Sequence, residues 1–265
     1  MKRISLNKNN HNFKIGDKCP DLEPNIKEDC LLTEDNKIVG FFIKKLPDKL
    51  CKIAELCDFE FRSNRVPKSQ NSGRILTDGY DEKTGKGKYI WNTQQYSCII
   101  GSVAPKHHLR RPYPTISSVH QVKTAKNFIK AMLLLAKESE KIIKNIIPDQ
   151  YEQLKKLFSE NVDEKWRFGN IFTSSISNFN INADFHIDRA NIPNSLNVII
   201  TKRKGSTGGN LVVPDYNAVF EQSDNSMLVY PAWRNMHGVT PIKAFAKGGY
   251  RNSLVFYPLK AFLNK

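Results

Sequence analysis

The chain has 265 residues, which suffices for one substantial domain or two small ones. Its hydrophobic content of 40% is that of a globular protein and excludes the disordered class. Lys and Arg number 41 against 26 Asp and Glu, so the formal charge at pH 7 is +15. This excess favours an anionic partner, with nucleic acid the first candidate, over a lysine-rich composition that binds nothing.

Cysteine usage and the apolar pattern indicate the compartment. The five cysteines stand at irregular spacings without a Cys-x-x-Cys pair, which argues against a disulfide framework and a structural zinc site. The first 20 residues lack the apolar stretch of a signal peptide, and no apolar run reaches transmembrane length. We therefore expect a soluble intracellular protein without a membrane partner, in the cytoplasm of a bacterial host or associated with a nucleoid or nucleus.

The amino-terminal third alternates short apolar runs with segments typical of loops. Residues 1–20 predict a polar, basic lead-in, while the runs at 38–43 and 50–56 predict a strand and a short helix. Residues 62–88 are rich in Gly, Ser, Asn and Lys, as loops are. The run TGKGK inside this segment lacks the glycine spacing and the Ser or Thr of a phosphate-binding loop, so we predict none there.

Helices precede strands in the remainder of the chain. A strand-like segment at 89–103 is followed by apolar residues at helical spacing over 123–147, which Pro148 ends, and by a second helix over 151–157. After Trp166 come short strands bounded by turn residues. This order predicts an α+β fold with helices packed on one face of a mostly antiparallel sheet. The predicted strands of this half are 171–181, 195–202, 208–214, 227–231 and 253–259.

The motif FHIDRAN, residues 185–191, places a histidine and a carboxylate two positions apart at the end of a strand-like run. Side chains alternate between the faces of a strand, so His186 and Asp188 project to the same side. His237 follows a later predicted strand. Two imidazoles and one carboxylate form the facial triad of non-heme Fe(II) oxygenases, which leaves coordination positions open for a cosubstrate and oxygen. The alternative is a polar strand end and a histidine in a turn.

A cation beyond His237 extends this hypothesis. Arg251 stands fourteen residues after His237 at the head of a predicted strand, and Ser253 follows two positions later. A guanidinium pairs with a carboxylate through two parallel hydrogen bonds, so Arg251 is suited to the distal carboxylate of 2-oxoglutarate, with the Ser253 hydroxyl as a further donor. The order of these residues predicts Fe(II) and 2-oxoglutarate as cofactors, with O2 as cosubstrate. The alternative for Arg251 is one more charge of a basic protein.

Two sequence blocks resemble the TET/JBP dioxygenases, which oxidise the 5-methyl group of pyrimidine bases in nucleic acid. FTSSISNFNINADFHIDRAN, residues 172–191, looks like the family's strand leading into an HxDxxN motif. RNSLVFYPLK, residues 251–260, looks like the RxSLVFY element of the TET branch. The resemblance implies that His186, Asp188 and His237 are the iron ligands and catalytic residues.

The resemblance also implies the fold and the substrate contacts. It implies a double-stranded β-helix core, which we expect over residues 89–265, with residues 1–88 a basic lead-in and loops packed on it. Asn191, the last position of HxDxxN, would hydrogen-bond the flipped base, and Tyr257 would stack on it. Leu259 stands where the TET branch has a histidine that contacts the base ring. The choice between methylcytosine and thymine therefore stays open at this point.

Residues and resemblance together predict a dioxygenase that flips 5-methylcytosine out of DNA and oxidises it to 5-hydroxymethylcytosine, with oxidation on to formyl and carboxyl forms left open. Alternatives of the same fold are a thymine hydroxylase that forms 5-hydroxymethyluracil and an RNA-base hydroxylase. A protein or small-molecule hydroxylase is disfavoured by the charge of +15 and by Asn191 and Tyr257. The remaining alternative is a non-catalytic nucleic-acid-binding module. No protein partner is predicted.

Candidate contacts to the DNA backbone are basic residues in loops that also carry Pro, Ser or Gly. For any one of them, the alternative is a solvated charge. The candidates are Arg62, Arg65, Lys68, Arg74, Arg110, Arg111, Lys202, Arg203 and Lys204.

Overall fold

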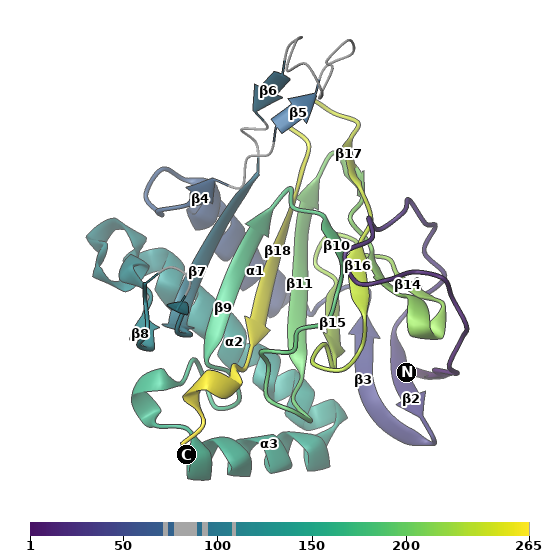
Figure 1. Cartoon of the computed structure of the whole chain (residues 1–265), viewed down its shortest axis with the longest axis horizontal. Coiled ribbons are helices and arrows are strands. Elements are labelled where there is room, and N and C mark those ends of the chain that lie inside the picture. The colour runs from purple at the N-terminus through teal and green to yellow at the C-terminus, as the bar shows by residue number, and fades with distance from the viewer. Residues whose placement is uncertain (71–73, 77–88, 92–94, 108–109, 265) are drawn as a thin grey trace.

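The computed structural model describes residues 1–70, 74–76, 89–91, 95–107 and 110–264, and the TGKGK run lies outside the described residues. A large sheet runs through the molecule (Figure 1). Apart from the parallel pair β1–β2, neighbouring strands in it are antiparallel. Its strands in spatial order are β1 (Lys2–Ser5), β2 (Cys30–Glu34), β3 (Lys37–Ile43), β15 (Met227–Tyr230), β11 (Asn197–Lys204), β18 (Tyr250–Tyr257), β9 (Ser174–Phe179), β7 (Tyr96–Val103) and β4 (Ser69–Gln70), with β8 (Thr115–Ile116) paired to β7.

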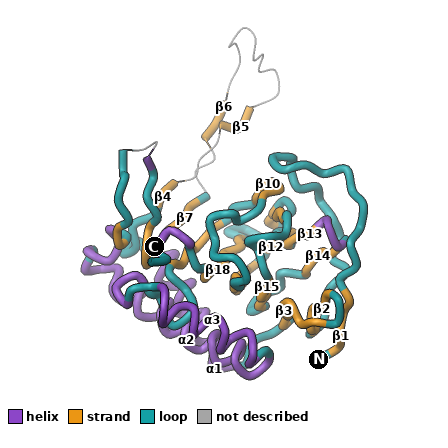
Figure 2. Tube along the Cα trace, turned by 60° about the horizontal axis from the view of Figure 1, so that its bottom comes forward, coloured by secondary structure: helices purple, strands orange, loops and turns teal. Residues whose placement is uncertain are grey.

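Helices cover one face of this sheet (Figure 2). The α-helices of the described residues are α1 (Asp48–Arg62), α2 (Lys126–Ile146) and α3 (Pro148–Asn161). In α2 the apolar side chains recur at helical spacing and pack in one core with Leu254 and Phe256 of β18. Pro148 ends α2 as predicted and begins α3, because a proline is tolerated in the first turn of a helix. None of the described helices is long and apolar enough to cross a membrane.

A second, smaller sheet lies against the opposite face of the large one. Its order is β10 (Ala183–His186), β16 (His237–Val239), β13 (Leu211–Val213) and β14 (Ala218–Phe220). Leu211 and Phe220 of this sheet share a core with Ile199 and Val255 of the large sheet, so apolar side chains fill the space between the two. Two further pairs are β12 (Ser206–Gly208) with β17 (Ile242–Ala244), and β5 (Arg74–Leu76) with β6 (Tyr89–Trp91).

The amino-terminal lead-in packs against and hydrogen-bonds with β10, the strand that carries His186. The ring of Phe13 packs 4.8 Å from that of Phe185, measured between centroids. Gly16 N donates to Phe185 O at 2.8 Å, and Phe185 N donates to Asp17 O at 2.9 Å. Backbone hydrogen bonds of this kind follow no side-chain pattern, which is why the sequence predicts only a polar lead-in here. The division of the chain at residue 88 stays a prediction.

Candidate metal and cosubstrate site

The pairing of β10 with β16 brings the two predicted histidine ligands together. His186 ends β10, His237 begins β16, and the two residues face each other in the antiparallel register. Asp188 Oδ1 lies 3.5 Å from His186 Nε2, and Asp188 Oδ2 lies 4.0 Å from His237 Nε2. One ligand atom from each of the three residues lies within 4.8 Å of the others, so all three reach a single metal ion.

Backbone carbonyls fix the orientation of both imidazoles. His186 Nδ1 lies 2.7 Å from Asp184 O, and His237 Nδ1 lies 2.9 Å from Asn235 O. A carbonyl oxygen only accepts, so each Nδ1 carries the hydrogen and each Nε2 keeps its lone pair for a metal. Burial lowers the pKa of His237 to about 4, so its imidazole is neutral near pH 7. The neutral imidazole is the form that binds metal ions.

Strand β18 presents the predicted cosubstrate residues on its inner face. Leu254 and Phe256 pack under the helices, so the alternate residues Arg251, Ser253 and Tyr257 point the other way, towards the small sheet. Register pairing places Arg251 opposite Arg203 of β11. The inner face of β18 thus carries a cation, a hydroxyl and an aromatic ring in that order.

Arg251 is a buried cation without an anionic partner among the described residues. Only 2% of its surface is exposed, and its Nε has no hydrogen-bond acceptor. Burial, with the like charge of Arg203 as the second cause, holds the pKa of Arg251 below its ordinary value. Burying an unpaired charge is costly, so this position is suited to an anionic ligand that supplies the missing partner.

The Arg251 side chain packs against the backbone of Gly209, where any larger residue would collide with it. The φ of Gly209 is +65°, and a Cβ built there would come within 2.8 Å of Arg251 Nε and closer still to Arg251 Cδ. Only glycine tolerates both this backbone conformation and so close an approach. In the sequence, the pair Gly208-Gly209 predicts a turn, but it does not predict that the Arg251 side chain packs against that turn.

Two asparagines are linked to the Asp188 carboxylate by hydrogen bonds, Asn197 directly and Asn191 through Asn197. Asn197 donates from Nδ2 to Asp188 Oδ2 at 2.9 Å, and Asn191 donates from Nδ2 to Asn197 Oδ1 at 2.8 Å. Both asparagines are buried. The sequence did not predict the role of Asn197; its only signal is a polar residue in the apolar strand run SLNVIITK. The predicted contact of Asn191 with a base stays a prediction.

Two tyrosines lie near the carboxylate of Asp188. Burial raises the pKa of Tyr257 and of Tyr230, and the charge of Asp188 is the second cause for both. The ring of Tyr230 also lies edge-on to His237, with 5.4 Å between centroids. Leu259 forms a β-bridge with Asn191, so the position at which the sequence departs from the TET branch lies beside this site.

The basic loop residues differ in their exposure. Arg110, Arg111 and Lys204 are exposed, as a contact to a phosphate requires. Arg65 is exposed as well but lies 3.5 Å from Glu60, and Lys68 donates to the carbonyl of Ser63 at 2.7 Å. The side chain of Arg74 lies outside the described residues.

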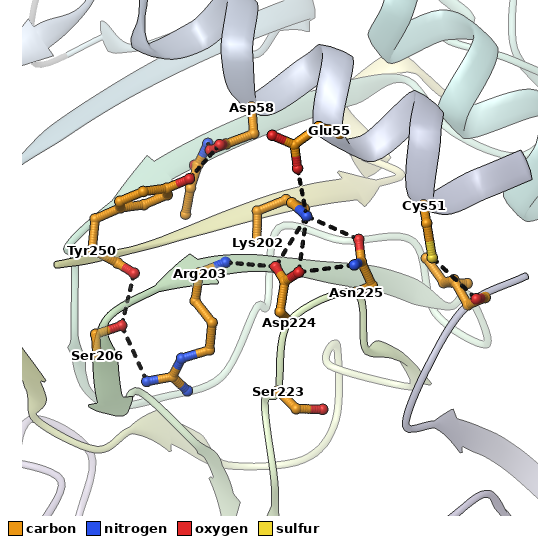
Figure 3. Close-up of polar contacts among 12 residues, drawn as sticks. Cys51, Glu55, Asp58, Lys202, Arg203, Ser206, Ser223, Asp224, Asn225 and Tyr250 are labelled. Carbon is orange, nitrogen blue, oxygen red and sulfur yellow. Dashed lines mark hydrogen bonds and ion pairs between the residues drawn. The ribbon is translucent and has the colours of Figure 1, made fainter. Parts of the chain in front are cut away.

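Lys202 differs from the expectation of a phosphate contact. Only 4% of its surface is exposed, and its ammonium lies 2.9 Å from Glu55, 3.0 Å from Asp224 and 3.0 Å from Asn225 Oδ1 (Figure 3). Burial lowers the pKa of Lys202, but its bonds to Glu55 and Asp224 outweigh this and hold the pKa above its ordinary value. The strand alternates faces, so Lys202 points under α1 rather than into a loop.

Arg203 also differs from that expectation. Its NH1 donates to the carbonyls of Gly208 and Gln222 at 3.0 and 2.9 Å, and its NH2 lies 3.3 Å from Ser206 Oγ. The guanidinium therefore ties the loop after β11 to the strand and keeps a positive charge beside Arg251. A side chain bound in this way is not offered to a phosphate.

A polar residue of α1, Asp58, contacts the residues on either side of Arg251. Asp58 of α1, which is fully buried, accepts from Tyr250 Oη at 2.7 Å (Figure 3). It also accepts from Asn252 Nδ2 at 3.0 Å. Arg62 donates to Asp58 at 2.9 Å and lies over the ring of Tyr250, so it too is engaged within the protein. Asp58 thus anchors the outer face of β18 at both neighbours of Arg251.

With this geometry in place, sequence comparison identifies the family. The Tet_JBP family, the oxygenase domain of the 2OGFeDO superfamily, matches residues 107–260. The chain belongs to this family. The matched range contains His186, Asp188, His237 and Arg251, and the match confirms the resemblance to the TET/JBP family. A search of the curated proteins gives no significant match.

Solved structures share the fold at low sequence identity. NgTET1 in complex with 5mC DNA aligns with a TM-score of 0.61 and 14% identity over 92% of this chain and 82% of that one. An oxidoreductase of the 2OG-Fe(II) oxygenase family from Burkholderia pseudomallei has a TM-score of 0.43 and 14% identity over 82% of both chains. A full-length Neurospora crassa protein in complex with alpha-KG has a TM-score of 0.41 and 11% identity, over 83% of this chain and 75% of that one. At this identity, the likeness to NgTET1 shows a shared mixed α+β oxygenase fold.

The family's cofactors fit the residues found here. Proteins of this superfamily use Fe(II) and 2-oxoglutarate, and this chain is an oxygenase domain of that class. His186, Asp188 and His237 offer the two nitrogens and one carboxylate that non-heme iron takes, with positions left open. Arg251 offers an unpaired buried cation for a carboxylate. The donor set and the orphan cation both fit the expected pair of cofactors.

Proposed function

We propose that the protein oxidises the 5-methyl group of 5-methylcytosine in DNA to 5-hydroxymethylcytosine. The observation that carries the proposal is the site's composition: a His–Asp–His triad lies on the inner face of the sheets with the buried Arg251 and the half-buried Tyr257. The likeness to a structure that holds 5mC DNA and the charge of +15 support this substrate. The two facing sheets support a double-stranded β-helix as the core of the domain over residues 89–265.

A methyl C–H bond is inert to acid–base chemistry, so the oxidising power comes from iron, 2-oxoglutarate and oxygen when they are bound. In this proposal the chain's own residues bind and orient. His186, Asp188 and His237 hold the metal, while Arg251 pairs with the distal carboxylate of 2-oxoglutarate and Ser253 donates to it. Because Arg251 is buried, its ionic contacts with that carboxylate are stronger than they would be in water.

The base must leave the helix to reach this site. A methyl group stacked inside a duplex cannot approach a metal held between two sheets, so the nucleotide is flipped out or already single-stranded. Flipping costs a few kcal/mol, and stacking on the Tyr257 ring with a hydrogen bond to Asn191 would offset part of it. Exposed Arg110, Arg111 and Lys204 are the candidates for phosphate contacts that position the DNA.

Nucleoside analysis tests the substrate. The purified protein is incubated with Fe(II), 2-oxoglutarate and matched duplexes that carry or lack 5-methylcytosine, and the digested nucleosides are identified by mass. We expect 5-hydroxymethylcytosine from the methylated duplex only, and none without Fe(II). Formyl and carboxyl products at longer times would show how far oxidation runs.

The same assay separates the alternatives. Release of 5-hydroxymethyluracil without 5-hydroxymethylcytosine would assign thymine as the substrate and contradict the proposal, and product from RNA alone would assign an RNA-base hydroxylase. DNA binding without Fe(II)-dependent formation of succinate would indicate a non-catalytic binding module. The hydrophobic Leu259 beside Asn191 is the observation that keeps thymine as the second candidate.

A further inference from the structure

Hydrogen bonds link the half-buried carboxylate of Asp188 to two buried asparagines, and this chain leads away from the metal site into the large sheet. Asp188 Oδ2 accepts from Asn197 Nδ2 at 2.9 Å, and Asn197 Oδ1 accepts from Asn191 Nδ2 at 2.8 Å. Asn197 is 3% exposed and lies at the start of β11, where Tyr230 of β15 is its partner in register. The carboxylate is thus held by a residue of the large sheet, while the two histidines come from the small one.

Chemistry fixes the direction of each hydrogen bond in this chain. A carboxylate only accepts, so Asn197 must turn its amide nitrogen towards Asp188. Its amide oxygen then faces Asn191, which must donate. Reversing either amide would set two acceptors or two donors against each other in a buried place, where an unsatisfied polar group costs about 1–3 kcal/mol. The chain therefore has one satisfied arrangement.

The bond from Asn197 distinguishes the two oxygens of Asp188. Oδ2 is engaged by an amide donor from the sheet, while Oδ1, 3.5 Å from His186 Nε2, has no hydrogen-bond donor among the described residues. A carboxylate that turned freely would offer both oxygens to the metal and occupy one of the positions needed by 2-oxoglutarate or oxygen. With Oδ2 held by Asn197, Oδ1 would be the oxygen offered to a metal, and the carboxylate would bind through that one oxygen.

We propose that Asn197 is a positioning residue for the metal ligand Asp188, and that Asn191 acts behind it by fixing the Asn197 amide. This proposal uses the metal site and does not depend on DNA as the substrate. Outer partners of metal ligands typically change metal affinity by about 10- to 100-fold when removed, because they orient the ligand and set its basicity.

The test measures metal binding without turnover. Co(II) is titrated into the metal-free full-length protein by calorimetry, and the absorption spectrum of the bound Co(II) reports its coordination. The variants are Asn197→Ala, which removes both bonds, and Asn191→Ala, which leaves the Asn197–Asp188 bond but frees the Asn197 amide. Ser195→Ala is the matched control, because Ser195 lies two residues away, is equally buried and has a hydroxyl without a partner among the described residues.

We expect Asn197→Ala to weaken Co(II) binding by about 10- to 100-fold and to change the Co(II) spectrum. Asn191→Ala should cause a smaller loss in the same direction, and Ser195→Ala should bind Co(II) like the wild type. Urea unfolding of the metal-free proteins checks that each variant is folded; if Asn197→Ala is not, Asn191→Ala alone decides. Wild-type affinity and spectrum in the folded asparagine variants would overturn the proposal.

The outcome is independent of the proposed activity. If the wild type binds Co(II) but gives no oxidised nucleoside, the substrate assignment fails while the role of Asn197 is still measured. If the wild type oxidises methylcytosine and Asn197→Ala keeps wild-type affinity and spectrum, the positioning role fails and the proposed function stands.

Discussion

The two faces of strands β11 and β18 differ in whether their buried charged groups are paired within the chain. Under α1, the ammonium of Lys202 contacts two carboxylates, and Asp58 accepts from Tyr250, Asn252 and Arg62. On the inner face, Arg251 is buried without an anion among the described residues, and His186, Asp188 and His237 each bring one ligand atom within 4.8 Å of the others. The charged groups under α1 have partners within the chain, whereas Arg251 and the triad have the chemistry to bind ligands.

This difference separates a structural role from a functional one. Groups that already have partners contribute to the free energy of unfolding, and removing one leaves its buried partners unsatisfied. Groups that lack partners destabilise the ligand-free protein and contribute to ligand affinity instead. Substitutions on the two faces should therefore have effects of different kinds, which the following predictions use.

The largest effect is expected at the triad. His186→Ala or Asp188→Ala should abolish Fe(II)-dependent consumption of 2-oxoglutarate, with a loss greater than the ~100-fold that follows removal of an outer partner. Succinate formation is the measurement, and His107→Ala, at an exposed histidine, is the control. Unchanged consumption in either triad variant would show that the metal assignment is wrong.

Arg251→Met should come next. It removes the cation proposed to pair with the distal carboxylate, so affinity for 2-oxoglutarate should fall by about 100-fold or more. Calorimetry with the Co(II)-loaded protein measures this, and Co(II) affinity itself should be unchanged. Equal 2-oxoglutarate affinity in variant and wild type would place the cosubstrate elsewhere.

On the outer face, Asp58→Ala should act on stability. It leaves Tyr250 Oη and Asn252 Nδ2 buried without their acceptor and breaks the ion pair with Arg62, which should lower the free energy of unfolding by about 3 kcal/mol. Urea denaturation is the measurement, with Lys52→Ala as the control, because Lys52 is an exposed residue of the same helix. Co(II) affinity of the folded variant should match the wild type; a loss there would contradict the division between the faces.

The smallest effect is expected at Gly209. Gly209→Ala adds a methyl group against the Arg251 side chain and should weaken 2-oxoglutarate binding by about 10-fold without changing Co(II) affinity. Gly248→Ala is a matched control, since Gly248 also has a positive φ, +72°, but nothing lies within 4 Å of its Cβ position. Equal behaviour of the two variants would mean that backbone strain, rather than contact with Arg251, causes the change.

The sequence predicted the elements whose side chains repeat and the residues whose chemistry is unusual. Helix α2 and strands β9, β11, β15 and β18 fall where periodicity predicts them, and the triad assembles as its spacing implies. Helices α1 and α3 are longer than predicted, because their outward faces are polar and their ends depend on packing.

What the sequence could not predict depends on pairing between distant segments. The contact of Asn197 with Asp188 requires the loop after β10 to meet the start of β11, and the burial of Lys202 follows from the face that β11 turns towards α1. In the sequence KRKG, Lys202, Arg203 and Lys204 look alike, yet only Lys204 is exposed. Register and strand order decide such questions, and neither is visible in a single sequence.

The most direct test of the contrast between the faces is the free energy of unfolding of Arg251→Met and of wild type, each measured with and without Co(II) plus saturating 2-oxoglutarate. Without ligands, the variant should be the more stable protein, by about 1 kcal/mol, because an unpaired buried cation has been removed. With ligands, the wild type should be the more stable. Ligand at about 100 times its Kd adds ~2.7 kcal/mol to the free energy of unfolding of the wild type, and the variant, which binds 2-oxoglutarate more weakly, gains less. A variant that is less stable under both conditions would contradict the account.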